Sequence, residues 1–138
     1  MAESVCSYLL KQQNIQNIAV QSAAAHRDEI GNPPYYLTCE KLKREGIPLV
    51  PHRARLLTKE DGKQYDLLIG MDEYNVRDMR RIVGEEYSGK VYKLLDFTPQ
   101  PRSVADPWYT RDFDRTYEDI CEGLQGLFSY LKERGVFY

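Results

Sequence analysis

The sequence predicts a three-layer α/β/α domain with a parallel sheet. Short apolar stretches that are typical of buried strands alternate with longer amphipathic stretches that are typical of helices. This alternation favours a parallel sheet with helices on both faces. The chain has 138 residues, which is enough for one domain. No repeat, low-complexity tract or linker interrupts the sequence, so we expect residues 1–138 to form a single domain.

The N-terminal part is predicted to form a helix, a strand and a second helix. One helical face is formed by apolar residues at i, i+3, i+4, i+7 and i+8, namely Ala2, Val5, Cys6, Leu9 and Leu10. A short buried strand is expected at Ile18–Ser22. A loop follows at 23–36, because Gly31-Asn32-Pro33-Pro34 breaks regular structure. The next helix runs from about Thr38 to Glu45, and Gly46 ends it.

The clearest strand lies in the middle of the chain. Residues 47–57 are predicted to be extended or irregular, because Pro48 and Pro51 disfavour a helix. Thr58 has the side chain to cap a short helical turn after them. Tyr65–Gly70 is short, apolar and ended by glycine, and we expect it to be a buried strand.

The second half continues the same alternation. A helix is expected at Glu73–Val83, opened by Asp72 and stopped by Gly84. A further strand is predicted at Val91–Leu95. The proline-rich stretch Asp96–Asp112 is expected to be a loop, and loops of this length in compact domains are usually functional or disordered.

The last helix has the strongest pattern. Its apolar face extends over five turns and is formed by Phe113, Tyr117, Ile120, Leu124, Leu127, Phe128 and Leu131. The chain thus contains only three strand candidates and opens on a helix. Since a buried parallel sheet of this size usually has at least about four strands, we expect a first strand to be missing.

The composition excludes several classes of function. The chain has 19 basic and 21 acidic residues, so it lacks the excess of basic charge that sequence-independent binding of nucleic acid needs. No apolar run approaches the roughly 18–20 residues of a membrane span, and we see no secretory signal. Three cysteines are too few for a disulfide scaffold, so we expect reduced thiols and a cytoplasmic protein. The two histidines are not spaced as metal ligands are, so we expect no metal site. We also expect no other cofactor.

Several stretches together resemble the low-molecular-weight protein tyrosine phosphatases. They occur in the family's order over nearly the whole chain: Met1-Ala2-Glu3, Val20–Ala24, Glu29–Pro34, His52–Arg55, Tyr65–Glu73 and Asp106-Pro107-Trp108-Tyr109. The resemblance implies the family's three-layer fold. It also implies hydrolysis of phosphotyrosine or small phosphomonoesters through a cysteinyl-phosphate.

One part of the family pattern is absent. The family carries its nucleophile on a loop that reads Cys, five residues, Arg, then Ser or Thr, between the first strand and the first helix. No cysteine of this sequence has the required arginine, since Gln12 follows Cys6 at that spacing, Glu45 follows Cys39 and Leu127 follows Cys121. The thiolate, the arginine and the main-chain amides that hold the phosphate all belong to that loop. We therefore expect this chain alone to be inactive.

Four residues match substrate-site positions of the family. The resemblance makes Asp106 the general acid that protonates the leaving oxygen and later activates water. It makes Trp108 and Tyr109 an aromatic wall for the phosphotyrosine ring, and it places Asp28 in the variable loop opposite, where a carboxylate would repel phosphate. From local sequence alone, Asp106 is a turn residue beside a proline and the two aromatic residues belong to a core lid.

Two further residues match positions that support the catalytic loop. Ser22 and His52 correspond to groups that hydrogen-bond to that loop in the family. The alternative for His52 is an ordinary structural histidine. Asp72 is most simply the cap of the following helix.

Removal of a central strand would leave backbone groups unpaired, each at a cost of about 1–3 kcal/mol. Three compensations are open: direct pairing of the remaining strands, exchange of elements between two chains, or use of Gly135–Tyr138 as a substitute strand within one chain or between chains. Our hypothesis is a homo-oligomer. A non-catalytic binding protein that acts as such an oligomer is the alternative function. Arsenate reduction ranks third, because neither Cys39 nor Cys121 is placed as a resolving thiol.

Overall fold

The computed structural model describes residues 1–23, 36–50, 55–105 and 112–135. In chain order its elements are α1 (Ala2–Gln12), α2 (Tyr36–Arg44), α3 (Lys59–Gln64), β1 (Leu68–Gly70), α4 (Glu73–Val83), η2 (Ser88–Lys90), β2 (Val91–Lys93), η3 (Leu94–Phe97) and α6 (Phe113–Glu133), where η marks a 3₁₀ helix.

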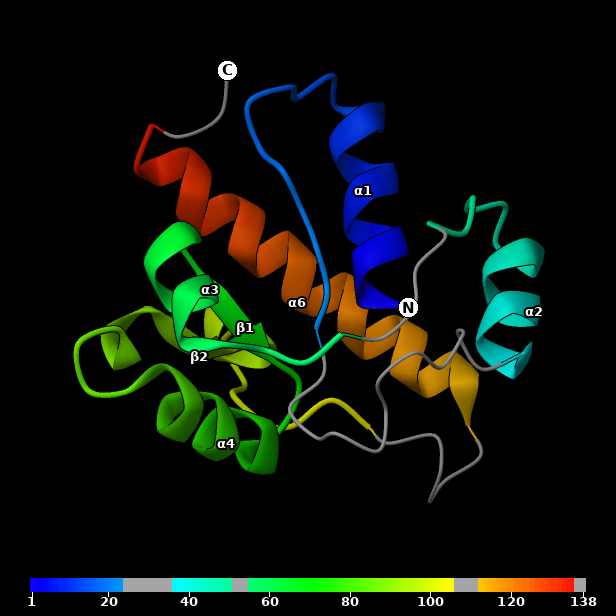
Figure 1. The fold of residues 1–138 in the computed structure, drawn as a ribbon. Coiled ribbons are helices and arrows are strands. Elements are labelled where there is room, and N and C mark those ends of the chain that lie inside the picture. The colour runs from blue at the N-terminus through cyan, green and yellow to red at the C-terminus, as the bar shows by residue number, and fades with distance from the viewer. Residues whose placement is uncertain (24–35, 51–54, 106–111, 136–138) are drawn as a thin grey trace.

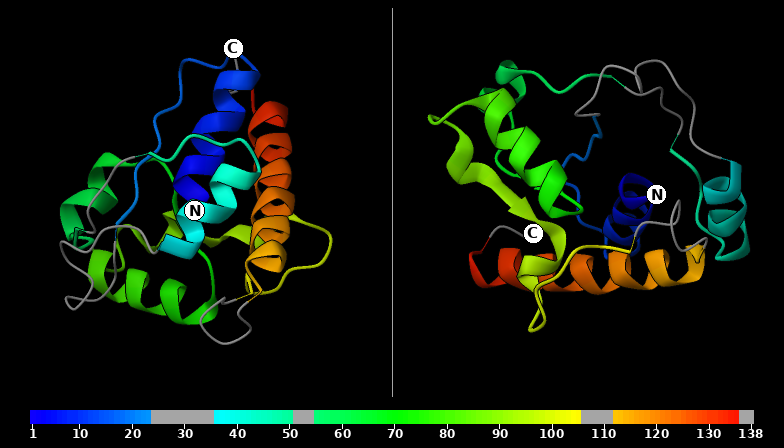
Figure 2. Two further views of the ribbon diagram at one scale, coloured as in Figure 1. Left: turned by 90° about the vertical axis from the view of Figure 1, so that its right-hand side faces the viewer. Right: turned by 90° about the horizontal axis from the view of Figure 1, so that it is seen from below.

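The sheet of the described residues consists of two parallel strands. Leu68 pairs with Val91, Ile69 with Tyr92 and Gly70 with Lys93. Helix α4 connects the two strands and covers one face of the sheet, whereas α6 and α1 lie on the other face (Figures 1 and 2). The predicted α/β architecture with a parallel sheet is therefore confirmed, and the arrangement in three layers is consistent with it.

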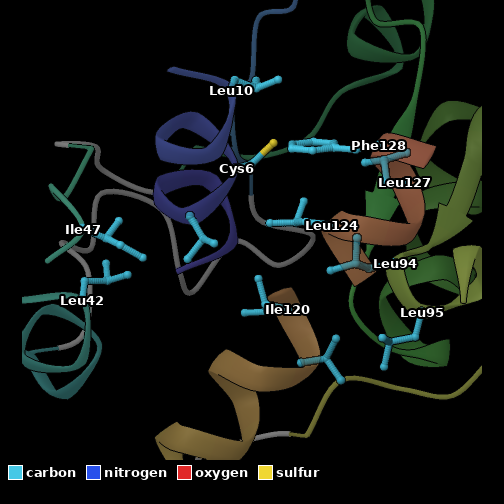
Figure 3. Packing of buried hydrophobic residues seen from close by; sticks show 12 residues of the cluster. Cys6, Leu10, Leu42, Ile47, Leu94, Leu95, Ile120, Leu124, Leu127 and Phe128 are labelled. Atoms are coloured by element: carbon cyan, nitrogen blue, oxygen red, sulfur yellow. The ribbon is translucent and has the colours of Figure 1, made fainter. Parts of the chain in front are cut away.

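A separate apolar cluster fills each interface between the layers. The larger cluster joins α1, α2, η3 and α6, and Figure 3 shows the Cys6 side chain of α1 directed toward Phe128 of α6. The smaller cluster joins the two strands to α4 through Leu68, Val76 and Val91. Both faces of the sheet are thus buried, as parallel strands require.

The caps that the sequence predicted at α3 and α4 are present. The Thr58 hydroxyl accepts a hydrogen bond from the Asp61 N–H, and the Asp61 carboxylate accepts one from the Thr58 N–H. Asp72 accepts from the Asn75 N–H at 2.8 Å. Gly84, with φ of 82°, ends α4 in a conformation that other residues rarely adopt.

The prediction of a strand at Ile18–Ser22 is wrong for the described residues. This segment runs alongside α1 (Figure 1), and Ile18 and Val20 pack against the larger apolar cluster. None of the described residues pairs with it in a ladder. Its apolar residues are partly buried, but a strand also needs a neighbouring backbone.

The two observed strands are shorter than expected. β1 begins at Leu68 instead of Tyr65, because Tyr65 still ends α3 with its N–H bonded to the Asp61 carbonyl. β2 ends at Lys93, because the backbone turns into η3 directly afterwards. The apolar run 91–95 therefore belongs to a strand and a 3₁₀ helix, a distinction that hydrophobicity alone does not make.

Candidate functional site

The chain that leads to Asp106 lies at the carboxyl end of β1. The Val104 N–H donates to the carbonyl of Met71, the residue after β1, at 2.9 Å. In open parallel sheets, ligands bind at the carboxyl ends of the strands. Val104 and Ala105 therefore lie at the edge of the sheet where a ligand site is expected.

Both backbone groups of Ala105 are bound by side chains of α6. The Ala105 N–H donates to Asp119 Oδ2 at 3.0 Å, and its carbonyl accepts from Thr116 Oγ1 at 2.7 Å. Asp119 is only 3% exposed, and its other oxygen, Oδ1, accepts from Arg102 Nη2 at 2.9 Å. The residue before Asp106 is thus fixed to a rigid helix.

Most of the residues predicted for the substrate site lie outside the described part of the chain. These are Asp28, His52, Asp106, Trp108 and Tyr109. The structure describes the residues on either side of Asp106, Trp108 and Tyr109, namely Ala105 and Asp112, but it does not test the three roles.

Ser22 is described, and its side chain bonds to a residue of α1. Its hydroxyl donates to Glu3 Oε1 in the first turn of α1 at 2.9 Å. Next to it, Gln21 Oε1 accepts from the Tyr65 hydroxyl at 2.5 Å. The segment around Ser22 is thus joined by side chains to the start of α1 and to the residues before β1.

Asp72 is a structural cap, as expected. Its carboxylate accepts from the Asn75 N–H, and the Asn75 side-chain oxygen in turn accepts from the Met71 N–H at 3.2 Å. These two bonds fix the turn between β1 and α4, at the same edge of the sheet as Val104.

The settings of Cys6 and Cys121 do not favour a thiolate. Burial raises the pKa of Cys6 to about 11. Burial also raises the pKa of Cys121, which lies beside Tyr117. A catalytic cysteine needs the opposite shift, which nearby cations or a helix N-terminus produce. Cys6 therefore packs as a small core residue, as the sequence predicted.

A buried lysine joins α2 to the first turn of α6. Lys41 Nζ lies 2.5 Å from Asp114 Oδ1 and 2.6 Å from Glu45 Oε1, and 5.0 Å from the centre of the Tyr117 ring. The hydrogen bond to Asp114, followed by that to Glu45, raises the pKa of Lys41. The same contact with Lys41 lowers the pKa of Asp114. The two helices that follow residues 24–35 and 106–111 are therefore joined by an ion pair.

The polar residues that fix Ala105 were not predicted from the sequence. A signal was available, because Thr116 and Asp119 lie three residues apart, about one helical turn, beside the apolar face of α6. Both are buried. A polar edge along an apolar face can mark buried hydrogen bonds to another segment.

No group of three or more potential metal ligands occurs among the described residues. Within the same residues, no helix has both the length and the apolar composition that a membrane crossing needs.

The chain belongs to the low molecular weight phosphotyrosine protein phosphatase family. The pattern of that family matches residues 1–136. The human low molecular weight phosphotyrosine protein phosphatase is 41% identical over 118 residues, which are 83% of this chain and 74% of the human protein. The low molecular weight protein-tyrosine-phosphatase PtpA of Staphylococcus aureus strain MRSA252 is 31% identical over 132 residues, 95% of this chain and 84% of PtpA.

Solved structures agree on the fold. The crystal structure of YfkJ from Bacillus subtilis superposes with a TM-score of 0.90 at 29% identity, over 96% of this chain and 86% of YfkJ. The protein tyrosine phosphatase of Entamoeba histolytica, crystallised with Hepes in its active site, superposes with a TM-score of 0.87 at 23% identity. That match covers 97% of this chain and 88% of the Entamoeba protein, and it supports the fold alone.

Proposed function

We propose that this chain supplies the proton donor and the substrate wall of a phosphotyrosine phosphatase. We further propose that hydrolysis requires a Cys-x5-Arg loop, which its 138 residues do not contain. The observation that carries the proposal is the family match over residues 1–136 together with the absence of an arginine six residues after any cysteine. The buried setting of Cys6 and the partly buried setting of Cys121 support it, because burial raises the pKa of both thiols and so disfavours their thiolates.

The reaction of a form that carries the loop would proceed in two steps. A cysteine thiolate attacks phosphorus, the bond from phosphorus to the phenolic oxygen breaks, and Asp106 gives its proton to the leaving oxygen. The Asp106 carboxylate then accepts a proton from water as that water attacks the phosphocysteine. Inorganic phosphate leaves and the thiolate is restored. The substrate is a phosphotyrosine protein or a small phosphomonoester.

The remaining predicted residues would shape the pocket. Trp108 and Tyr109 would pack against the phenyl ring, and Asp28 would face the phosphate from the other side. A carboxylate there repels a dianion and contributes little to ring packing, so we propose weaker binding of phosphotyrosine than an aromatic residue at this position would allow. Ser22 and His52 would support the loop, and the bond from Ser22 to Glu3 already joins Ser22 to the start of α1.

Hydrolysis of p-nitrophenyl phosphate tests this proposal. The 138-residue chain is compared with an extended form, in which a strand and a Cys-x5-Arg loop of the family pattern precede Met1. We expect turnover only in the extended form, and none when the loop cysteine is replaced by serine. Turnover by the 138-residue chain, or an inactive but folded extended form, would contradict the proposal.

The second candidate function is a non-catalytic binding protein that works as an oligomer. The small size of the sheet favours it, since among the described residues β1 forms a ladder with β2 and Ile18–Ser22 forms none. A strand edge that is not covered within one chain can pair with a second copy. Sedimentation at several concentrations tests this function. A mass of 16.1 kDa throughout would reject it, and a dimer mass would support it.

We also propose a reducing compartment such as the cytoplasm. The three cysteines, of which Cys6 is buried, form no disulfide in the structure.

A further inference from the structure

We infer that Asp119 and Thr116 are positioning residues for Asp106, because from α6 they hold both backbone groups of the residue that precedes it. This inference rests on the proposed role of Asp106 as the proton donor. It assigns a role in the site to two residues of α6 that would not themselves contact the substrate.

The first observation is that Ala105 has no free backbone group. Its N–H is bonded to Asp119 Oδ2 and its carbonyl to Thr116 Oγ1, at 3.0 and 2.7 Å. The preceding residue, Val104, is 7% exposed and donates to the Met71 carbonyl at the end of β1. The chain that enters the Asp106 segment is therefore fixed from the sheet on one side and from α6 on the other.

The second observation is that Thr116 contacts both ends of the segment 106–111. Its hydroxyl oxygen lies 2.7 Å from the Ala105 carbonyl and 3.3 Å from the carbonyl of Asp112, the cap of α6. A hydroxyl has a single hydrogen, and the shorter distance assigns it to Ala105. The Thr116 N–H in turn donates to the Asp112 carbonyl at 3.3 Å, so the residues on either side of segment 106–111 are both bonded to Thr116.

The third observation is the charge on Asp119. A buried carboxylate is unfavourable unless its charge and both oxygens are compensated. The two carboxylate oxygens of Asp119 have different partners. Oδ1 lies 2.9 Å from Arg102 and 3.5 Å from Arg115, and these cations compensate the charge. Oδ2 accepts the hydrogen bond from the Ala105 N–H. If residue 119 served only to fill space in the core, an apolar side chain of similar volume would do so equally well. The geometry instead directs a charge-assisted bond to the residue next to Asp106.

Such a contact matters for catalysis because a general acid must lie within hydrogen-bond reach of the leaving oxygen. A displacement of roughly 1 Å can reduce the rate about 100-fold. If Ala105 is released, Asp106 is expected to remain ionisable but to be presented less often in the productive position.

The test uses Asp119→Asn and Thr116→Val, which keep the shape of each side chain, and Glu118→Gln as the matched control on the exposed side of the same helix. In the 138-residue chain we expect both variants, but not the control, to speed hydrogen exchange of the Ala105 amide. Fluorescence of Trp108, the single tryptophan, should change in parallel. Unchanged exchange and fluorescence would overturn the inference.

The second readout is the leaving-group dependence of kcat/KM in the extended form, because kcat/KM reports the attack on phosphorus and not the later water step that both substrates share. Phenyl phosphate has a poor leaving group that needs the acid, whereas p-nitrophenyl phosphate needs it much less. We expect kcat/KM for phenyl phosphate to fall roughly 10-fold or more, with little change in kcat/KM for p-nitrophenyl phosphate. An equal fall for both substrates would show a purely structural role and overturn the inference. An inactive extended wild type would instead overturn the proposed function, and with it the catalytic meaning of the Ala105 contacts.

Discussion

The two halves of α6 are held in the protein by contacts of different kinds. In the C-terminal half, Gly123 and Gly126 let η3 approach so closely that an added Cβ would lie 2.4 Å from Leu94 Cγ and 2.2 Å from the Phe97 carbonyl oxygen, respectively. In the N-terminal half, Thr116 and Asp119 make hydrogen bonds to Ala105 instead.

This difference shows how one helix serves both the core and the site. Close apolar packing fixes the C-terminal half. The N-terminal half also packs into the larger apolar cluster through Ile120, but it adds charges and hydrogen bonds, which place neighbouring backbone atoms with more directional precision than apolar contacts do. We therefore expect substitutions in the first half to change the position of residue 105, and substitutions in the second half to change stability.

The largest effect is expected for Gly126→Ala. The added Cβ would meet a backbone carbonyl, which cannot rotate away, so η3 and α6 must separate. We expect a loss of about 3 kcal/mol in the free energy of unfolding, measured by urea denaturation. Gly89→Ala is the control, because nothing lies within 4 Å of a Cβ at that position. Its stability should change by no more than about 1 kcal/mol. Equal effects of the two substitutions would contradict the close approach of η3 to α6.

An intermediate effect is expected for Thr116→Val. The substitution removes the hydroxyl that donates to the Ala105 carbonyl but keeps the volume of the side chain. One hydrogen bond contributes about 1 kcal/mol, so the loss should be clearly smaller than that of Gly126→Ala. The same denaturation measurement decides the order. If Thr116→Val were the more harmful change, the division of α6 into an apolar and a polar half would be wrong.

The smallest effect at neutral pH is expected for the ion pair between Lys41 and Asp114. Asp114 has a lowered pKa through its bond to Lys41, so its contribution to stability is present above the unfolded pKa and is lost as the pH falls through the folded value. Lys41 has a raised pKa through the same bond, so its contribution is present below the unfolded pKa and is lost as the pH rises through the folded value.

Lys41→Met tests this pair through the pH and salt dependence of the melting temperature. We expect the variant to lose less stability than the wild type at both acidic and alkaline extremes, and to respond less to added salt. The control is Lys43→Met on the same helix, whose side chain is exposed. Identical pH profiles of Lys41→Met and Lys43→Met would show that the ion pair makes no contribution.

Local sequence patterns predicted the helices of this fold better than its strands. The apolar stripe of α6 was correct, and Ile120, Leu124 and Leu127 are buried. Caps depend on neighbouring residues alone, and Thr58 and Asp72 follow the rule. Strand pairing depends on a partner that is distant in sequence, which explains why Ile18–Ser22 shows the pattern of a strand without forming one among the described residues.

The candidate site was predicted by a different route. Asp106, Trp108 and Tyr109 came from resemblance to a family, not from local pattern, and their roles stay predictions. The spacing of Thr116 and Asp119 beside the apolar face of α6 could have marked them as buried polar residues, but it could not identify the group that they bind. Their partner, Ala105, has no distinctive side chain, and only the fold brings its backbone to α6.

Under the proposed function, hydrolysis requires a cysteine that the 138 residues do not provide. Trapping of the phosphocysteine tests this requirement most directly. Both forms carry Asp106→Asn, which hardly slows attack on p-nitrophenyl phosphate but slows the water step that needs a base. After a rapid acid quench, the intact mass is measured and the modified residue is mapped. We predict one phosphoryl group on the loop cysteine of the extended form and none on the 138-residue chain. Phosphorylation of Cys6, Cys39 or Cys121 in the 138-residue chain would contradict the account.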